Sequence, residues 1–246
     1  MSALLRAELI KLRTTRTFAA LAGVALATSM LITGLEAALD DPSESTVLVD
    51  VFTSDTSGLF ILVLAIVGIS GEWRHRTITS SLLAAPARVR FLIAKTLAFA
   101  AAGLLLSLLV SLAISILGSA ILDSRGMPVP AAGELVEQGA RNALVAALFG
   151  AFGVGIGGLV RNQPVAIVGV LMMSFVFEPG LIALEPDVAK FGPFASLPLG
   201  IQDIPPELIG WDTEIFDTLP ATLLMLAWIG IFFAVTAILL RTRDVE

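Results

Sequence analysis

The feature that most constrains this chain is a series of long apolar segments almost free of charge. Residues 96–122 contain no Asp, Glu, Lys or Arg, and similar segments recur along the 246 residues. An apolar segment of about 20 residues can cross the hydrocarbon core of a bilayer as a helix. Charged residues make up only 15% of the chain, against roughly a quarter in typical soluble domains. The sequence therefore predicts an all-α protein that crosses a membrane several times.

Six segments are predicted to span the membrane. They cover roughly Phe18–Leu39, Ser57–Ser70, Phe91–Leu122, Ala143–Val160, Val165–Leu184 and Thr218–Leu240. The second is the shortest, and a start near Val51 would bring it closer to the length that a bilayer requires. The third is longer than a bilayer, so we expect it to tilt or to extend into the cytoplasm.

The distribution of charge predicts the orientation. If the N-terminus is cytoplasmic, 12 of the 15 Lys and Arg residues lie on the cytoplasmic side, and all but four of the 21 acidic residues lie on the other. Lys and Arg are enriched in cytoplasmic loops of membrane proteins. We therefore expect both termini, and the stretch between the second and third spans, to be cytoplasmic.

Several classes of function are disfavoured by what the sequence lacks. There is no cysteine, and the only histidine, His75, lies in a cytoplasmic loop, so no intramembrane Ser-His pair can form. There is no metal-ligand spacing of His, Asp and Glu and no GxxxxGK[ST] phosphate loop. No ionisable residue lies in the middle of a predicted span. The sequence predicts no catalytic, cofactor or metal site in this chain, and no nucleic-acid partner.

Small residues recur at every fourth position of the third span: Gly103, Ser107, Ser111, Ser115 and Ser119. Four-residue spacing places them on one face of a helix. The fourth span carries Gly153 and Gly157 at the same spacing. Small residues allow helix backbones to approach closely in lipid. The serine stripe either packs helices together or lines a substrate route or a dimer seam.

Two carboxylates lie near the outer ends of spans. A carrier driven by protons or sodium ions usually needs an ionisable group or a broken helix near the middle of the membrane. Glu36 and Glu178 come closest, and Pro179 should kink the helix beside Glu178. Glu178 lies either in the outer headgroup region or in an outward vestibule. The acidic, proline-rich segment that follows, about 185–217, is expected to pack as short helices or turns on the outer end of the bundle.

Basic residues and His75 gather in "GEWRHRTITSSLLAAPARVRFLIAK", residues 71–95. Residues 72–84 are predicted to form a short, weakly amphipathic helix with Ile78 and Leu82 on one face, and Pro86 ends it. The stretch is either an ordinary positive loop that contacts anionic lipid or a docking element for a cytoplasmic partner. A docking element here could move two spans at once, because both of its ends are tied to them.

Two motifs resemble the membrane subunits of bacterial type-2 ABC exporters. "AELIKLRTTRT", residues 7–17, is similar to the interfacial helix that precedes the first span in that family. In residues 71–95 the family's order of a glutamate, a threonine, a leucine, a proline, an arginine and a lysine is matched by Glu72, Thr77, Leu82, Pro86, Arg88 and Lys95. Arg76 departs from the pattern, since many members have glycine before the threonine.

The resemblance implies a division of labour in the cytoplasmic membrane of a bacterium. Residues 1–17 would form an interfacial amphipathic helix and residues 18–246 a six-span domain, with a coupling helix at about 72–85. The coupling helix would contact a separate ATP-binding subunit through Glu72, Arg74, His75, Arg76, Thr77, Thr79 and Ser80. The interfacial helix would contribute Arg6, Glu8, Lys11 and Arg13. ATP and Mg²⁺ would bind to that partner, and a second permease copy or a paralogue would complete the pathway.

Two other functions stay open on the sequence. The chain could be a stand-alone carrier or channel, which would transport without an ATPase. It could also be a membrane anchor for a cytoplasmic partner, without transport. Nothing in the residues selects a substrate.

Overall fold

The structure is a computed structural model that describes residues 2–74, 88–160, 162–209, 211 and 214–242. Its described part is helical and contains no β-strand. Six helical segments are long and apolar enough to cross a membrane, which confirms the prediction of a six-span, all-α chain. In chain order, spans 1 to 6 are Arg16–Leu39, Val47–Arg74, Arg88–Ser124, Ala132–Leu159, Gln163–Leu184 and Thr218–Leu240.

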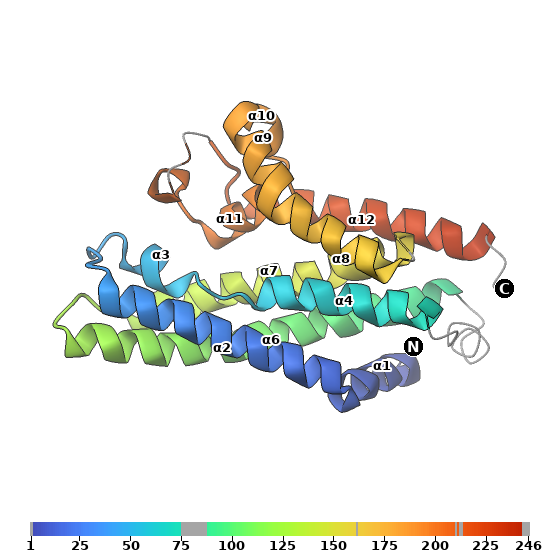
Figure 1. Cartoon of the computed structure of the whole chain (residues 1–246), viewed down its shortest axis with the longest axis horizontal. Coiled ribbons are helices and arrows are strands. Elements are labelled where there is room, and N and C mark those ends of the chain that lie inside the picture. The colour runs from blue at the N-terminus through green and yellow to red at the C-terminus, as the bar shows by residue number, and fades with distance from the viewer. Residues whose placement is uncertain (1, 75–87, 161, 210, 212–213, 243–246) are drawn as a thin grey trace.

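Spans 1, 3, 4 and 6 are each one continuous helix. They are α2 (Arg16–Leu39), α6 (Arg88–Ser124), α7 (Ala132–Leu159) and α12 (Thr218–Thr242). The short helix α1 (Ser2–Thr14) precedes α2. In Figure 1, α1 and the C-terminal end of α12 lie at the same end of the bundle, which is called the terminal end below. The opposite end, where α2 leads into α3 (Val47–Phe52), is called the distal end.

Span 2 is broken, whereas the sequence predicted one uninterrupted helix that ends at Ser70 and begins at Ser57 or near Val51. It consists of α3 and α4 (Ser57–Arg74), joined by the non-helical residues 53–56. The joining sequence is Thr-Ser-Asp-Thr, and such side chains compete with the helix for hydrogen bonds. Thr53 and Ser54 do so here, since their hydroxyls donate to the carbonyls of Val49 and Val51. The span therefore begins at Val47, close to the expected start near Val51, and ends at Arg74 and not at Ser70.

Span 5 is also irregular. It runs through α8 (Gln163–Met172), a π-helix (Met173–Phe177) and α9 (Glu178–Leu184). Pro179 has no N–H to donate in the first turn of α9, and a π-helical turn is one way for a helix to accommodate an interruption of its hydrogen bonding. The acidic, proline-rich segment that follows span 5 then forms α10 (Pro186–Ala189), α11 (Ser196–Gln202) and a 3₁₀ turn (Pro206–Ile209), in accord with the short helices expected there.

Helix α7 is the centre of the bundle, because its glycines let three helices approach it. A Cβ on Gly153 would lie 2.5 Å from the Leu62 carbonyl of α4, and one on Gly150 would lie 2.3 Å from the Phe99 carbonyl of α6. A Cβ on Gly155 would lie 2.9 Å from Phe232 of α12. Close backbone approach of this kind holds helices together in lipid, where no hydrophobic effect drives them together.

Candidate functional site

The predicted partner-facing residues lie at the terminal end, as far as the structure describes them. The side chains of Arg6, Arg13 and Arg74 are exposed there. Glu8 and Glu72 are buried instead, with 6% and 7% of their surface exposed. The other predicted coupling residues, His75, Arg76, Thr77, Thr79 and Ser80, lie outside the described residues.

Glu8 and Glu72 are buried because they form a charge cluster with Lys11 and Lys95. The Lys95 ammonium, on a residue only 2% exposed, lies 2.7 Å from Glu8 Oε2 and 3.1 Å from Glu72 Oε1. Lys11 Nζ lies 2.8 Å from Glu8 Oε1 and 3.3 Å from Glu72 Oε1. Two carboxylates thus pair with two ammonium groups. Removal of one partner from a buried ion pair leaves the other charge buried without compensation, which strongly destabilises the fold.

The charge cluster joins three helices at the terminal end. Glu8 and Lys11 come from α1, Glu72 from the last turns of α4, and Lys95 from the first turns of α6. Burial lowers the pKa of Lys11, but the hydrogen bond from Lys11 to Glu8 and the negative charges of Glu72 and Glu8 outweigh it, so the pKa is raised. Lys11 therefore stays protonated at neutral pH and pairs with Glu72 of α4, while Lys95 joins both α1 and α4 to α6.

Helices α6 and α12 are also tied together at the terminal end, where the Arg88 guanidinium donates a hydrogen bond to the Leu240 carbonyl. Residues 75–87 therefore connect two helix ends, Arg74 and Arg88, that are both anchored to other parts of the bundle. Sequence reasoning named Glu8, Lys11, Glu72 and Lys95 as separate members of two motifs. It missed their mutual contact, for which the sequence carried one signal, namely that Glu8 and Glu72 are acidic residues in helix ends that are otherwise rich in Lys and Arg.

The serine stripe is buried inside the protein over part of its length. Ser107 and Ser111 are buried, whereas Ser115 and Ser119 are half-buried. The hydroxyls of Ser107 and Ser111 both donate to Oδ2 of Asp55, over 2.5 and 3.0 Å. Asp55 belongs to the break in span 2. Sequence reasoning did not single it out, because it lies close to the expected start of the second span, between Val51 and Ser57.

Further polar side chains surround this carboxylate. Asn142 of α7 donates to the Ser111 hydroxyl and to the Phe52 carbonyl, each over 3.3 Å. Its own amide oxygen accepts from Gln138 and Gln202, at 3.1 and 2.8 Å. Helices α3, α6, α7 and α11 are thereby linked through hydrogen bonds around the break in span 2.

Glu178 is buried, with 3% of its surface exposed, and its carboxylate accepts three backbone hydrogen bonds. The donors are the N–H groups of Phe194, Ala195 and Ser196, at 2.9 to 3.0 Å. A Cβ on Gly192 would lie 2.0 Å from Glu178 Oε1, so only glycine fits beside it. In this arrangement Glu178 fixes the loop before α11 onto span 5.

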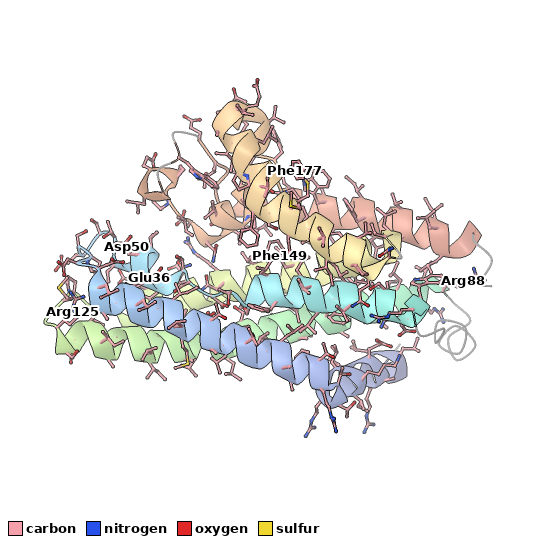
Figure 2. All side chains as sticks on the ribbon, viewed as in Figure 1. Glu36, Asp50, Arg88, Arg125, Phe149 and Phe177 are labelled. Atoms are coloured by element: carbon pink, nitrogen blue, oxygen red, sulfur yellow. The ribbon has the colours of Figure 1, made fainter. Side chains whose placement is uncertain are left out.

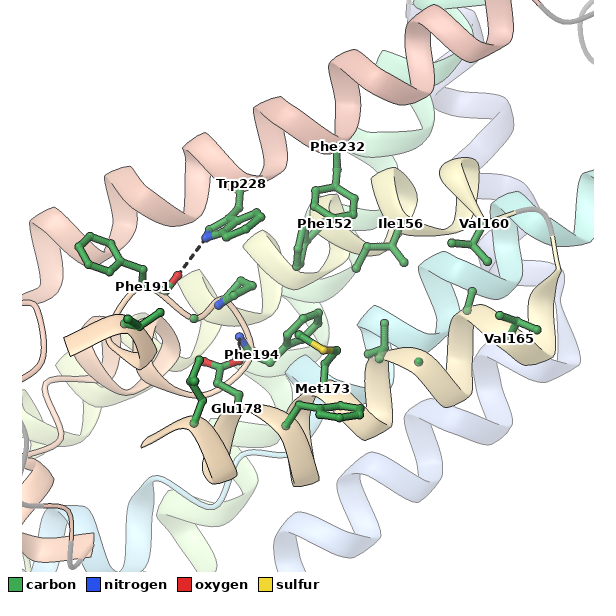
Figure 3. Close-up of a pocket in the computed structure, with 18 residues that line it drawn as sticks. Phe152, Ile156, Val160, Val165, Met173, Glu178, Phe191, Phe194, Trp228 and Phe232 are labelled. Carbon is green, nitrogen blue, oxygen red and sulfur yellow. Dashed lines mark hydrogen bonds between the residues drawn. The ribbon is translucent and has the colours of Figure 1, made fainter. Parts of the chain in front are cut away.

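An apolar cavity of about 680 Å³ lies between spans 4, 5 and 6, beside Glu178 (Figure 3). Phe152, Phe194, Trp228 and Phe232 form part of its wall, and the Trp228 indole donates to the Phe191 carbonyl over 3.0 Å. The only carboxylate in the lining, Glu178, is already engaged by three backbone N–H groups. The cavity could therefore hold an apolar group, and offers little to a charged one.

The polar side chains described above form ion pairs and hydrogen bonds that hold helices together, and the cavity is apolar. They contain no cluster of three or more His, Cys, Asp or Glu side chains able to hold a metal ion. A comparison with known protein families gave no matching family, and a comparison with curated proteins gave no match either.

Proposed function

We propose that this chain is the membrane subunit of an ATP-driven exporter and that a separate ABC-type subunit binds and hydrolyses the ATP. The observation that carries this proposal is the anchoring at the terminal end. Residues 75–87 continue from α4 on one side and into α6 on the other, and the charge cluster binds both helices to α1. A force on this loop would be transmitted to spans 2 and 3 together.

The proposed mechanism follows from that connection. Rigid helices that share an anchor move as one body, which is a common basis for switching between two states. Exposed Arg6, Arg13 and Arg74 would present a positive surface to the ATPase. The resemblance of residues 7–17 and 71–95 to type-2 ABC exporters supports the same arrangement. In it the terminal end is cytoplasmic, and a second copy or a paralogue encloses the pathway in the plasma membrane of a bacterium.

The first test is purification of the tagged chain in mild detergent from its native host, followed by mass spectrometry. We expect an ABC-type ATPase in stoichiometric amount. If the chain emerges alone, and stays alone after cross-linking in cells, the proposal fails.

The second test addresses coupling. Reversal of charge in the double variant Arg74→Glu, Arg76→Glu should abolish stimulation of the partner's ATPase, while membrane insertion is retained. The matched control is Lys190→Glu, a reversal next to α10 and away from the terminal end, which should leave stimulation unchanged. Stimulation that survives in the double variant would favour a loop that only contacts anionic lipid.

A stand-alone carrier is the second candidate function, and Asp55 is the observation that favours it. A carboxylate in a broken span is typical of carriers driven by ions. The two functions differ in one measurable way: purified chain in lipid vesicles would transport without an ATPase only if it were a carrier.

A further inference from the structure

Another cavity lies at the terminal end of the bundle, beside the charge cluster, and is called the terminal cavity below. Its volume is about 440 Å³, and sites for small ligands typically have about 300–1,000 Å³. Five helices supply its wall, namely α1, α2, α4, α6 and α8. The charge cluster forms one part of this wall, and the chemistry of the remaining part decides what the terminal cavity can hold.

The deeper part of the wall is apolar. It includes Phe18 of α2, Leu64 and Val67 of α4 and Phe99 of α6. Leu64 and Phe99 are buried, whereas Phe18 and Val67 are partly exposed. The apolar part therefore reaches the outer surface of the spans, which faces lipid in a membrane, so an acyl chain can enter from that side.

The terminal cavity has the depth of one leaflet. Leu64 and Arg74 both belong to its wall and are about 15 Å apart along the axis of α4. The hydrocarbon core of a bilayer is about 30 Å thick, so one leaflet contributes about half of that. Apolar residues therefore line the deep end of the cavity, and the polar residues near Arg74 lie where the headgroups of the same leaflet begin.

The polar part of the wall offers hydrogen-bond donors that have room for an acceptor. Lys11 has three ammonium protons and directs two of them to Glu8 and Glu72. Arg74 has five N–H donors, and its guanidinium has no hydrogen bond or ion pair to any residue that the structure describes. The same is true of the side-chain amide of Gln163. These side chains suit a group that is rich in acceptor oxygens.

The charge of the terminal end favours a negative group. Among the described residues, Glu8 and Glu72 are the only carboxylates at this end, and both are paired within the charge cluster. Glu36 and Asp50 lie at the opposite, distal end (Figure 2). Further arginines are exposed at the terminal end: Arg6, Arg13, Arg16 and Arg90. Basic pockets between spans are typical sites for the headgroups of acidic lipids.

We infer that the terminal cavity binds an acidic phospholipid from the leaflet at the terminal end. Its phosphate accepts hydrogen bonds from Arg74, Lys11 and Gln163, and the upper part of one acyl chain lies along the apolar wall toward Leu64 and Phe99. The rest of the lipid stays in the bilayer, because a phospholipid is larger than the cavity. The inference does not depend on the proposed export function, since the site is complete within this chain.

The apolar part of the wall favours a lipid over a soluble anion. A free phosphate, or an acidic segment of a partner protein, would satisfy the donors but would leave the apolar wall and the deep end of the cavity unfilled. An acidic phospholipid matches both parts at once, with its charge at the donors and its chain at the aromatic and aliphatic side chains. The match in depth to one leaflet adds to this preference.

The test is native mass spectrometry of the purified full-length chain, first stripped of lipid in detergent and then titrated with phosphatidylglycerol. Phosphatidylcholine with the same acyl chains is the matched lipid, because its head carries a phosphate but no net charge. We expect one molecule of phosphatidylglycerol to bind roughly tenfold more tightly than phosphatidylcholine, since hydrogen bonds between charged groups are the strong ones. Glycerol 3-phosphate, which has the phosphate without a chain, should not displace it.

The first pair of variants tests the headgroup. Arg74→Gln should weaken the binding of phosphatidylglycerol roughly tenfold, because a charge-assisted hydrogen bond to the phosphate is lost. Arg90→Gln is the matched control, since Arg90 is exposed at the same end and lies outside the wall. An equal loss in both variants would mean that the lipid is attracted only by the general positive charge, and would overturn the site.

The second pair fills the terminal cavity and leaves every charge in place. Gly71 belongs to the wall, and a Cβ added to it would meet no atom within 4 Å. Gly71→Leu should therefore fold normally, elute as a single species and lose the tight binding of phosphatidylglycerol. Gly23→Leu is the control, because Gly23 has the same open space at an exposed position of α2 outside the wall. Equal affinity for the two lipids, displacement by glycerol 3-phosphate, or unchanged binding in Arg74→Gln or in Gly71→Leu would each overturn the inference.

Discussion

Lys95 places an ammonium group almost out of reach of water, and its contacts explain how the charge is tolerated. It contacts Glu8, Glu72 and the Gly68 carbonyl, so its charge is matched by two carboxylates and a further acceptor. Removing it would leave both carboxylates buried with only the partly exposed Lys11 to balance them. Loss of one partner from a buried ion pair typically costs about 3–5 kcal/mol.

Lys95→Met is therefore expected to destabilise the protein strongly. The measurement is the fraction of monodisperse protein that remains in detergent after heating, followed by size-exclusion chromatography. Lys11→Met is the matched control, because the Lys11 side chain is 52% exposed and loss of an exposed pair costs about 1 kcal/mol or less. Equal thermal midpoints for the two variants would mean that the charge cluster does not anchor α1.

At the scale of the helices, glycine decides how closely neighbours approach α7. Gly150 of α7 and Gly230 of α12 both lie inside long helices, but only Gly150 faces a backbone. A Cβ at Gly150 would lie 2.3 Å from the Phe99 carbonyl oxygen, whereas one at Gly230 would meet nothing within 4 Å. Gly150→Ala must push α6 away from α7, and overpacking of this kind costs about 1–3 kcal/mol.

We expect Gly150→Ala to lower the thermal midpoint. Gly230→Ala should be neutral or stabilising by up to about 1 kcal/mol, since alanine favours a helix over glycine. Thermal midpoints measured in the same detergent compare the two variants directly. If both alanines were tolerated equally, the close contact of α6 with α7 would not contribute to stability.

The helices themselves could be predicted from sequence better than their interruptions. Long apolar segments require spans wherever they occur, so all six were found. The break at residues 53–56 could not be predicted, because a span that begins near Val51 treats these residues as part of one helix and a span that begins at Ser57 leaves them out. Only contacts with Ala25, Ser29 and Ser107, which lie far away in the sequence, place the break beside the middle of α2 and α6. The same holds for Glu178, whose three backbone partners follow it by 16 to 18 residues.

For the whole molecule, the two ends of the bundle differ in charge and in the groups that they bury. The terminal end holds the charge cluster and exposed arginines, whereas the distal end holds a hollow whose wall includes the carboxylates of Glu36, Asp40, Asp41 and Asp50. Between them, α7 packs against α4, α6 and α12 through glycines. A change at the terminal end would therefore reach the break in span 2 through α4, which begins beside Asp55 and ends at the charge cluster.

The proposed export function requires the terminal end to be cytoplasmic, and the absence of cysteine from the chain makes the orientation easy to measure. Thr14→Cys places a single thiol at an exposed position of the terminal end, and Ser45→Cys places one at an exposed position of the distal end. In intact cells an impermeant thiol reagent should label Ser45→Cys and spare Thr14→Cys, while both should react after the membrane is permeabilised. Labelling of Thr14→Cys alone in intact cells would invert the topology, and residues 75–87 could then no longer meet a cytoplasmic ATPase.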